Sequence, residues 1–138
     1  MTVIINDAGF AVEDWEHGFF AAEELPANHP PALAVDIPSD IDVEALPALL
    51  ENVDLLRIDF PSFADGRGFT LAKRLRDLGF QGRLRARGHV ISDQYAMARR
   101  SGFDEVEISD DLATRQPESE WLARANWQEH NYQSRLRG

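Results

Sequence analysis

The sequence predicts an α/β protein in which βα units form a parallel four-stranded sheet, half-barrel-like, preceded by an N-terminal hairpin or arm. Three observations support this fold class. Short apolar runs alternate along the chain with segments whose apolar residues recur every three or four positions. Two of these helical segments end in the same Gly-Phe step. Within the expected strands, apolar residues alternate with charged ones, which predicts one apolar and one charged sheet face.

The length and composition fit one domain. The chain has 138 residues, a net charge of −10 and no cysteine. We expect a single α/β domain over residues 1–138, with an arm at 1–32, βα units at 33–117 and a C-terminal helix at 118–138. The acidic balance excludes nucleic acid and anionic membranes as partners, because both carry negative charge. The lack of cysteine excludes disulfides, thiolate nucleophiles and zinc ribbons.

The chain carries no targeting or spanning signal. No apolar run reaches the roughly 20 residues that a membrane-spanning helix needs. The opening MTVIINDAG has no basic region followed by a long apolar stretch, so it does not resemble a signal peptide. We therefore expect a cytoplasmic protein.

The first 32 residues predict a hairpin and a connecting segment. The apolar runs at 3–5 and 10–12 flank the turn residues 6–9, which is typical of a β-hairpin or a bent arm. Residues 13–32 mix aromatic and acidic side chains before three prolines, and they predict an irregular or partly helical lead-in.

The rest of the chain alternates strands and helices. Strands are expected at 33–37, 55–60, 83–88 and 105–108. Helices are expected after Asp42 as a cap, around Leu71 to Leu78, from Ser92 to Arg100 and over 118–134, the last with Trp121, Trp127 and Tyr132 either in the core or on a partner-binding stripe. Gly79-Phe80 and Gly102-Phe103 predict left-handed helix ends, after which the phenylalanine packs back onto the helix.

The charged positions of the strands indicate that helices cover only one sheet face. Strands covered on both faces are usually unbroken apolar runs, whereas Arg57 and Asp59 interrupt the second strand. One-sided helices are typical of a barrel segment. The alternative is a flat sheet whose charged face is solvated or crossed by salt bridges.

The connection after the second strand is the first candidate ligand site. It contains Asp65, Gly66, Arg67, Gly68 and Thr70 at the start of a helix. Ligands collect at the carboxyl ends of parallel strands, and two glycines allow backbone N–H groups to converge on an anion. The arginine and the threonine hydroxyl would add donors. In the alternative interpretation the aspartate caps the turn, the glycines meet steric needs and the arginine pairs with an acid.

A second group lies on the third strand. Arg85, Arg87 and His89 share one strand face and would form a positive pocket for sulfate, phosphate or a carboxylate if they lie near the first group. His89 is the candidate catalytic acid–base residue, since it follows a strand end. The alternative is an opposite-charge row with Asp59 and the glutamates of the fourth strand. The histidines do not share metal-ligand spacing, so no metal site is expected, and the cofactor is unknown.

Several motifs resemble those of a bacterial family of unknown function whose members are described as "probable oxidoreductase". They are Phe60-Pro61, Phe63, Asp65-Gly66-Arg67-Gly68, Leu84-Arg85-Ala86, Gly88, Asp93-Gln94 and Gly102-Phe103. The resemblance runs from about Val3 to the last helix. Because members often lie beside sulfite reductase genes, it implies a role in assimilatory sulfite reduction.

The resemblance and the residues together leave three functions open. The first is an accessory or interaction protein of sulfite reduction that binds a small oxyanion, with sulfite reductase or its electron donor as partner. The second is a small-anion-binding enzyme or an oxidoreductase with its site at the strand ends. The third is a structural homodimer. A redox role would require a bound flavin or nicotinamide.

Overall fold

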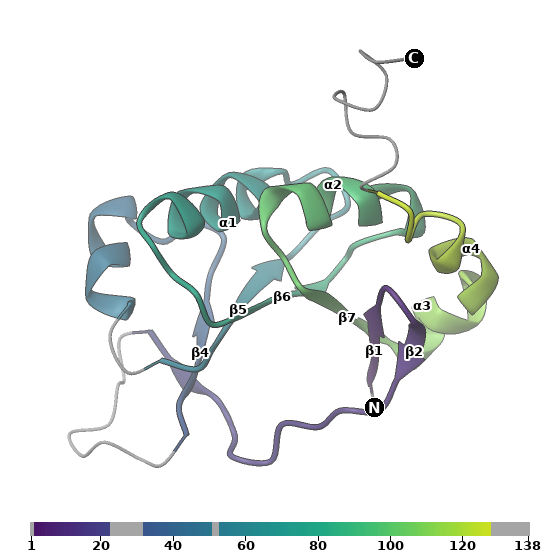
Figure 1. Cartoon of the computed structure of the whole chain (residues 1–138), viewed down its shortest axis with the longest axis horizontal. Coiled ribbons are helices and arrows are strands. Elements are labelled where there is room, and N and C mark those ends of the chain that lie inside the picture. The colour runs from purple at the N-terminus through teal and green to yellow at the C-terminus, as the bar shows by residue number, and fades with distance from the viewer. Residues whose placement is uncertain (1, 23–31, 51–52, 128–138) are drawn as a thin grey trace.

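A computed structural model describes residues 2–22, 32–50 and 53–127, and these form one seven-stranded sheet with helices packed against it (Figure 1). The strands are β1 (Thr2–Asn6), β2 (Gly9–Ala11), β3 (Phe20–Ala21), β4 (Ala34–Ile37), β5 (Leu55–Phe60), β6 (Arg83–Gly88) and β7 (Glu105–Ser109). The helices are the 3₁₀ helices η1 (Val43–Leu49) and η2 (Ser92–Gln94) and the α-helices α1 (Arg67–Asp77), α2 (Tyr95–Ser101), α3 (Asp110–Arg115) and α4 (Glu118–Leu122). Within the described ranges, none of these helices is long and apolar enough to cross a membrane.

The sheet confirms the α/β class, but the predicted number of strands was wrong. Its order is β2-β1-β7-β6-β5-β4-β3, and β4 to β7 are the four predicted parallel strands. The predicted hairpin forms, and β1 then pairs antiparallel with β7. At the other side β3 pairs parallel with β4. The added strands pair with the outer strands of the parallel sheet, whose free N–H and C=O groups would otherwise be open to pairing with another chain. The resulting sheet is open, with β2 and β3 at its edges.

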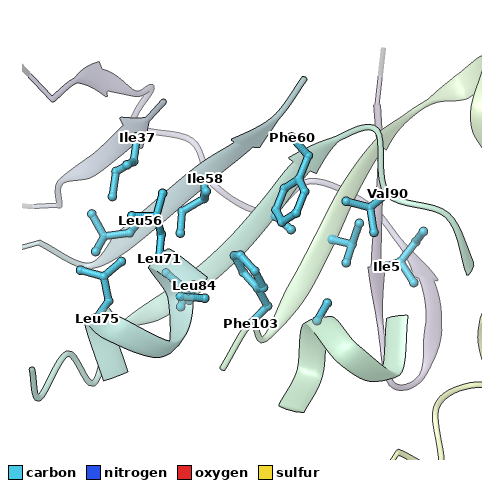
Figure 2. Close-up of a cluster of buried hydrophobic side chains, with 14 of the residues drawn as sticks. Ile5, Ile37, Leu56, Ile58, Phe60, Leu71, Leu75, Leu84, Val90 and Phe103 are labelled. Carbon is cyan, nitrogen blue, oxygen red and sulfur yellow. The ribbon is translucent and has the colours of Figure 1, made fainter. Parts of the chain in front are cut away.

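Helices lie on one face of the sheet, as predicted. Figure 1 shows α1 and α2 over one side, while the chain between β2 and β3 crosses the other side. Figure 2 shows the core between β5, β6 and the helices, where Leu56, Ile58 and Phe60 face Leu71 and Phe103. All five side chains are buried. Because alternate residues of a strand point to opposite faces, the charged residues between these apolar ones face away from the helices.

The two Gly-Phe helix ends form as predicted. Gly79 and Gly102 have φ values of 102° and 118°, a region that glycine adopts without steric strain. The Phe80 N–H donates to the Leu75 carbonyl at 3.0 Å, and the Phe103 N–H makes the equivalent bond at the end of α2. Both phenylalanines are buried, so each helix end is fixed to the core.

The helix that follows β4 begins at its predicted cap. The Asp42 carboxylate accepts a hydrogen bond from the Glu44 N–H at 3.0 Å. The segment is a 3₁₀ helix with Pro47 inside it, since proline has no N–H to donate to a regular α-helical ladder.

The C-terminal part of the chain differs from the prediction. Helix α3 was not predicted; it starts directly after β7, where the Ser109 hydroxyl accepts from the Leu112 N–H at 3.1 Å. The last helix was predicted over 118–134 but ends at Leu122. Trp121 is buried in the core, and Tyr132 lies outside the described residues.

Helix α1 approaches β5 closely through a glycine. A Cβ built on Gly68 would lie 2.4 Å from Cζ of Phe60, whereas one on Gly66 would meet no atom within 4 Å. Neither glycine has a positive φ. Close packing against the phenylalanine ring therefore explains the glycine at position 68.

We expect Gly68→Ala to lower the free energy of unfolding by about 1–3 kcal/mol, because the added methyl overpacks the contact with Phe60. Gly66→Ala is the matched control, and its loss should stay below about 1 kcal/mol. Urea unfolding followed by circular dichroism measures both. Equal losses in the two variants would contradict the packing explanation.

Candidate functional site

The sheet face away from the helices carries a layer of charged side chains. Strands β4 to β7 contribute four arginines and four acids to it. They are Asp36, Arg57, Asp59, Arg83, Arg85, Arg87, Glu105 and Glu107. Opposite charges face each other in register between β4 and β5, between β6 and β7, and at Asp59 and Arg87, which allows cross-strand ion pairs, whereas Arg57 lies opposite Arg85.

Arg85 is the buried centre of this layer. Its side chain has an exposed fraction of 0%, and its guanidinium binds three carboxylates. Nε donates to Glu105 at 2.5 Å and Nη1 to Glu107 at 2.9 Å. Nη1 and Nη2 donate to Glu13 at 2.6 and 2.9 Å. Burial alone would lower the pKa of Arg85, but the hydrogen bonds that it donates to Glu13 and the field of the carboxylates outweigh burial and raise that pKa. Arg85 therefore offers no surface to a ligand.

Arg57 is held in a similar way on β5. Its Nε and Nη2 donate to the Asp36 carboxylate at 2.5 and 2.9 Å, and Nη1 donates to Glu107 at 3.1 Å. The Phe19 ring, from the segment that crosses the sheet, lies 3.5 Å from the guanidinium carbon. This stacked and bidentate arrangement fixes the arginine side chain.

A pocket of about 260 Å³ opens at the carboxyl ends of β4, β5 and β6, on this charged face. Its charged lining comes from Asp36, Arg57, Asp59 and Arg87, and Ala21, Ile37 and Pro38 complete the wall. The volume lies just below the range of about 300–1,000 Å³ typical of small-molecule sites, which favours a small ligand.

Two of the pocket residues lack close partners. The Arg87 side chain is 48% exposed, and its one ion contact among the described residues is Nε to Glu107 at 3.7 Å, which is too long for a hydrogen bond. Asp59 makes no hydrogen bond and no ion pair in the part of the chain that the structure describes. The pocket therefore holds one arginine and one carboxylate that are both available to a ligand.

The predicted site in the β5–α1 connection forms a separate arrangement. Arg67 donates to Asp65 at 2.7 Å and to the Ser39 hydroxyl at 3.1 Å. The Arg67 hydrogen bonds hold the pKa of Asp65 well below its usual range. Arg67 and Thr70 line another hollow, of about 370 Å³, together with Leu71. The arginine pairs with a nearby acid here, as in the alternative interpretation of the sequence.

His89 lies beside the connection and not in the lining of the charged pocket. Its ring nitrogen Nδ1 is 3.2 Å from the Phe60 carbonyl oxygen, and its ring packs edge-on against Phe63 with centroids 5.2 Å apart. The described residues contain no group of three histidine, aspartate or glutamate side chains placed to hold a metal ion.

The structure thus divides the predicted ligand-binding residues among three places. Asp65, Gly66, Arg67, Gly68 and Thr70 lie at the start of α1, Arg85 lies inside the charged layer, and Arg87 alone lines the pocket on that layer. The other charged residues of the pocket were not predicted as site residues. Their sequence signal was the alternation of charged and apolar residues in β4 and β5.

Comparison with known proteins gives one finding. A family model described as a bacterial protein of unknown function (DUF934) matches residues 34–138. The chain belongs to this family. No curated protein and no solved structure matches the chain. The DUF934 region contains β4 to β7 and every charged residue of the pocket. The link to sulfite reductase and the oxidoreductase description stay predictions.

The segment that crosses the charged layer, residues 12–19, precedes the DUF934 region. Glu13 binds Arg85, and Asp14 binds Arg83 at 2.9 Å. Burial alone would raise the pKa of Glu13, but the hydrogen bonds from Arg85 outweigh it and hold that pKa below its ordinary value of 4.5. The Arg83 hydrogen bond likewise lowers the pKa of Asp14. Both carboxylates therefore attach this crossing segment to the sheet.

We expect Glu13→Gln to lower the free energy of unfolding at pH 7 by about 1.5–3 kcal/mol, the range for hydrogen bonds to charged groups. Since folding depresses the pKa of Glu13, its contribution is present above pH 4.5 and is lost as the pH falls through the folded-state value. The variant should therefore lose less stability than the parent protein on acidification.

Urea unfolding between pH 7 and pH 3 measures this difference. Glu16→Gln is the matched control, because Glu16 is an exposed acid of the same segment. The two variants should differ clearly at pH 7, and the difference should shrink as the pH falls below 4.5. The same loss in both at pH 7 would contradict a specific role for the Glu13–Arg85 contact.

Proposed function

We propose that this chain is an accessory protein of assimilatory sulfite reduction that binds a small oxyanion in the pocket at the ends of β4 to β6. The observation that carries the proposal is Arg87, which lines the pocket with a half-exposed guanidinium. A guanidinium presents several N–H donors in one plane and binds oxyanions through two parallel hydrogen bonds. The other arginine of the pocket, Arg57, already donates hydrogen bonds to two carboxylates. It adds positive charge to the pocket, but its guanidinium is not available for a two-point contact with an oxyanion.

The sulfur chemistry in the proposal comes from the family resemblance. Sulfite and sulfate are small oxyanions, and the pocket of about 260 Å³ is large enough to admit them. The chain has no cysteine, so thiol redox chemistry has no residue to act through. An accessory role, in which the protein holds the oxyanion and contacts the reductase or its electron donor, needs no redox group on this chain.

Sulfite and sulfate should raise the thermal unfolding midpoint of the full chain, because a ligand that binds only the folded state stabilises it. At 100 times the dissociation constant the gain is about 2.7 kcal/mol. Arg87→Gln should abolish the response. Arg115→Gln is the matched control, since Arg115 is an exposed arginine of α3 whose partner is Asp111.

The oxyanion part of the proposal is wrong if neither anion shifts the thermal unfolding midpoint. It is also wrong if the Arg87→Gln variant responds like the parent protein. Phosphate in a parallel titration tests selectivity for sulfur oxyanions. An equal response to all three anions would contradict a dedicated sulfur ligand.

The accessory part predicts that the tagged full chain binds purified sulfite reductase from the same bacterium, or its electron donor, at low ionic strength. Because the net charge of this chain is −10, we expect it to contact a basic patch on the partner, and such contacts weaken as salt is added. Pull-down at two salt concentrations, with an unrelated protein of similar negative charge as control, measures it. Failure to retain either protein at low salt would overturn this part.

A further inference from the structure

Two opposite-charge pairs on the polar face lie in register on neighbouring strands and form close ion pairs. Asp36 on β4 lies opposite Arg57 on β5 in register, and they form a two-point ion pair at 2.5 and 2.9 Å. Arg85 on β6 lies opposite Glu105 on β7, and they pair at 2.5 Å. Cross-strand register therefore brings opposite charges into contact on this face.

One pair of opposite charges that lies in register forms no ion pair. Asp59 on β5 lies opposite Arg87 on β6 in register, yet no ion pair joins them. Arg87 keeps its single 3.7 Å contact, to Glu107, and Asp59 has no partner among the described residues. Both side chains line the same pocket. The pocket thus presents a positive and a negative side chain on neighbouring strands, neither of which has a close partner among the described residues.

We propose that the natural ligand is a small zwitterion, which carries an ammonium group as well as the oxyanion. This inference rests on the proposed function, because it keeps the oxyanion on Arg87 and adds a cationic group on Asp59. A bare oxyanion in this pocket would lie close to the carboxylates of Asp59 and Asp36, and like charges at short range repel.

An ammonium group removes that repulsion. It has three N–H donors and no acceptor, and the Asp59 carboxylate has acceptor sites that no described residue fills. A ligand whose two charged groups are separated by a short chain would contact both strands at once. The class that fits is a small amino acid or aminosulfonate.

Two commercially available probes test the contributions of the ligand's positive and negative groups separately. Taurine has an ammonium and a sulfonate on a two-carbon chain, and ethanesulfonate has the same sulfonate and carbons without the ammonium. In calorimetric titrations of the full chain, taurine should bind at least about tenfold more tightly. Arg87→Gln should weaken both ligands. Asp59→Asn should remove the advantage of taurine and leave ethanesulfonate binding unchanged or tighter.

The outcomes distinguish this inference from the proposed function. If ethanesulfonate and sulfite bind through Arg87 as tightly as taurine does, the zwitterion is wrong and the oxyanion site stands. If taurine, ethanesulfonate and sulfite all fail to bind, both are wrong. A lower urea midpoint for Asp59→Asn without ligand would show that Asp59 pairs directly with Arg87, and this would also overturn the inference.

Discussion

The buried charge of Arg85 constrains the whole polar side of the molecule. A guanidinium without exposed surface is stable only where carboxylates replace the water that it has lost. Glu105 and Glu107 reach it because β6 and β7 keep their observed register, and Glu13 reaches it because residues 12–19 lie across the sheet. The register of the parallel strands and the path of the chain from the hairpin to β3 are therefore coupled through one side chain. No polar side-chain atom that is fully buried within the described ranges lacks a hydrogen-bond partner, so the layer is also satisfied as a network.

The parts of the fold that could be predicted are those with local signals. Strands β4 to β7 have alternating or apolar runs of their own, and the ends of α1 and α2 have a glycine where the backbone turns left-handed. The pairing of β1 with β7 has no such signal, because it joins segments about a hundred residues apart along the chain. Strand β3 has two residues, too few for any periodicity. The start of α3 did carry a signal, since Ser109 followed by two aspartates is a typical helix N-terminus.

The candidate site shows the same division between local and distant information. Strand-end reasoning placed the candidate residues at the carboxyl ends of the strands, but it could not say on which face of the sheet each side chain would lie. Arg67 begins a helix and lies with Ser39 and Thr70, whereas Arg87 belongs to a strand and points to the uncovered side. Arg85 and Arg87 are two residues apart with the same orientation, yet one is fully buried and the other half exposed. One contact that distinguishes them is with Glu13, which binds Arg85 and lies 72 positions away in the chain.

Along β6 the arginines of the charged layer are paired at the start and middle of the strand, and the last one lines the pocket. At the start of the strand Arg83 binds Asp14 and Glu105, and in the middle Arg85 binds three carboxylates, so the crossing segment supplies an acid to each. Among the described residues it supplies none to Arg87, whose ion contact is with Glu107. The last arginine of the row is left with a long contact to a glutamate that two other arginines already share. The arginines of β6 therefore form a rigid ion-pair network where the crossing segment supplies carboxylates. Where it supplies none, an arginine is left available to bind a ligand. A ligand with its own positive and negative groups would complete the pattern at the strand ends in the way that Glu13 completes it around Arg85.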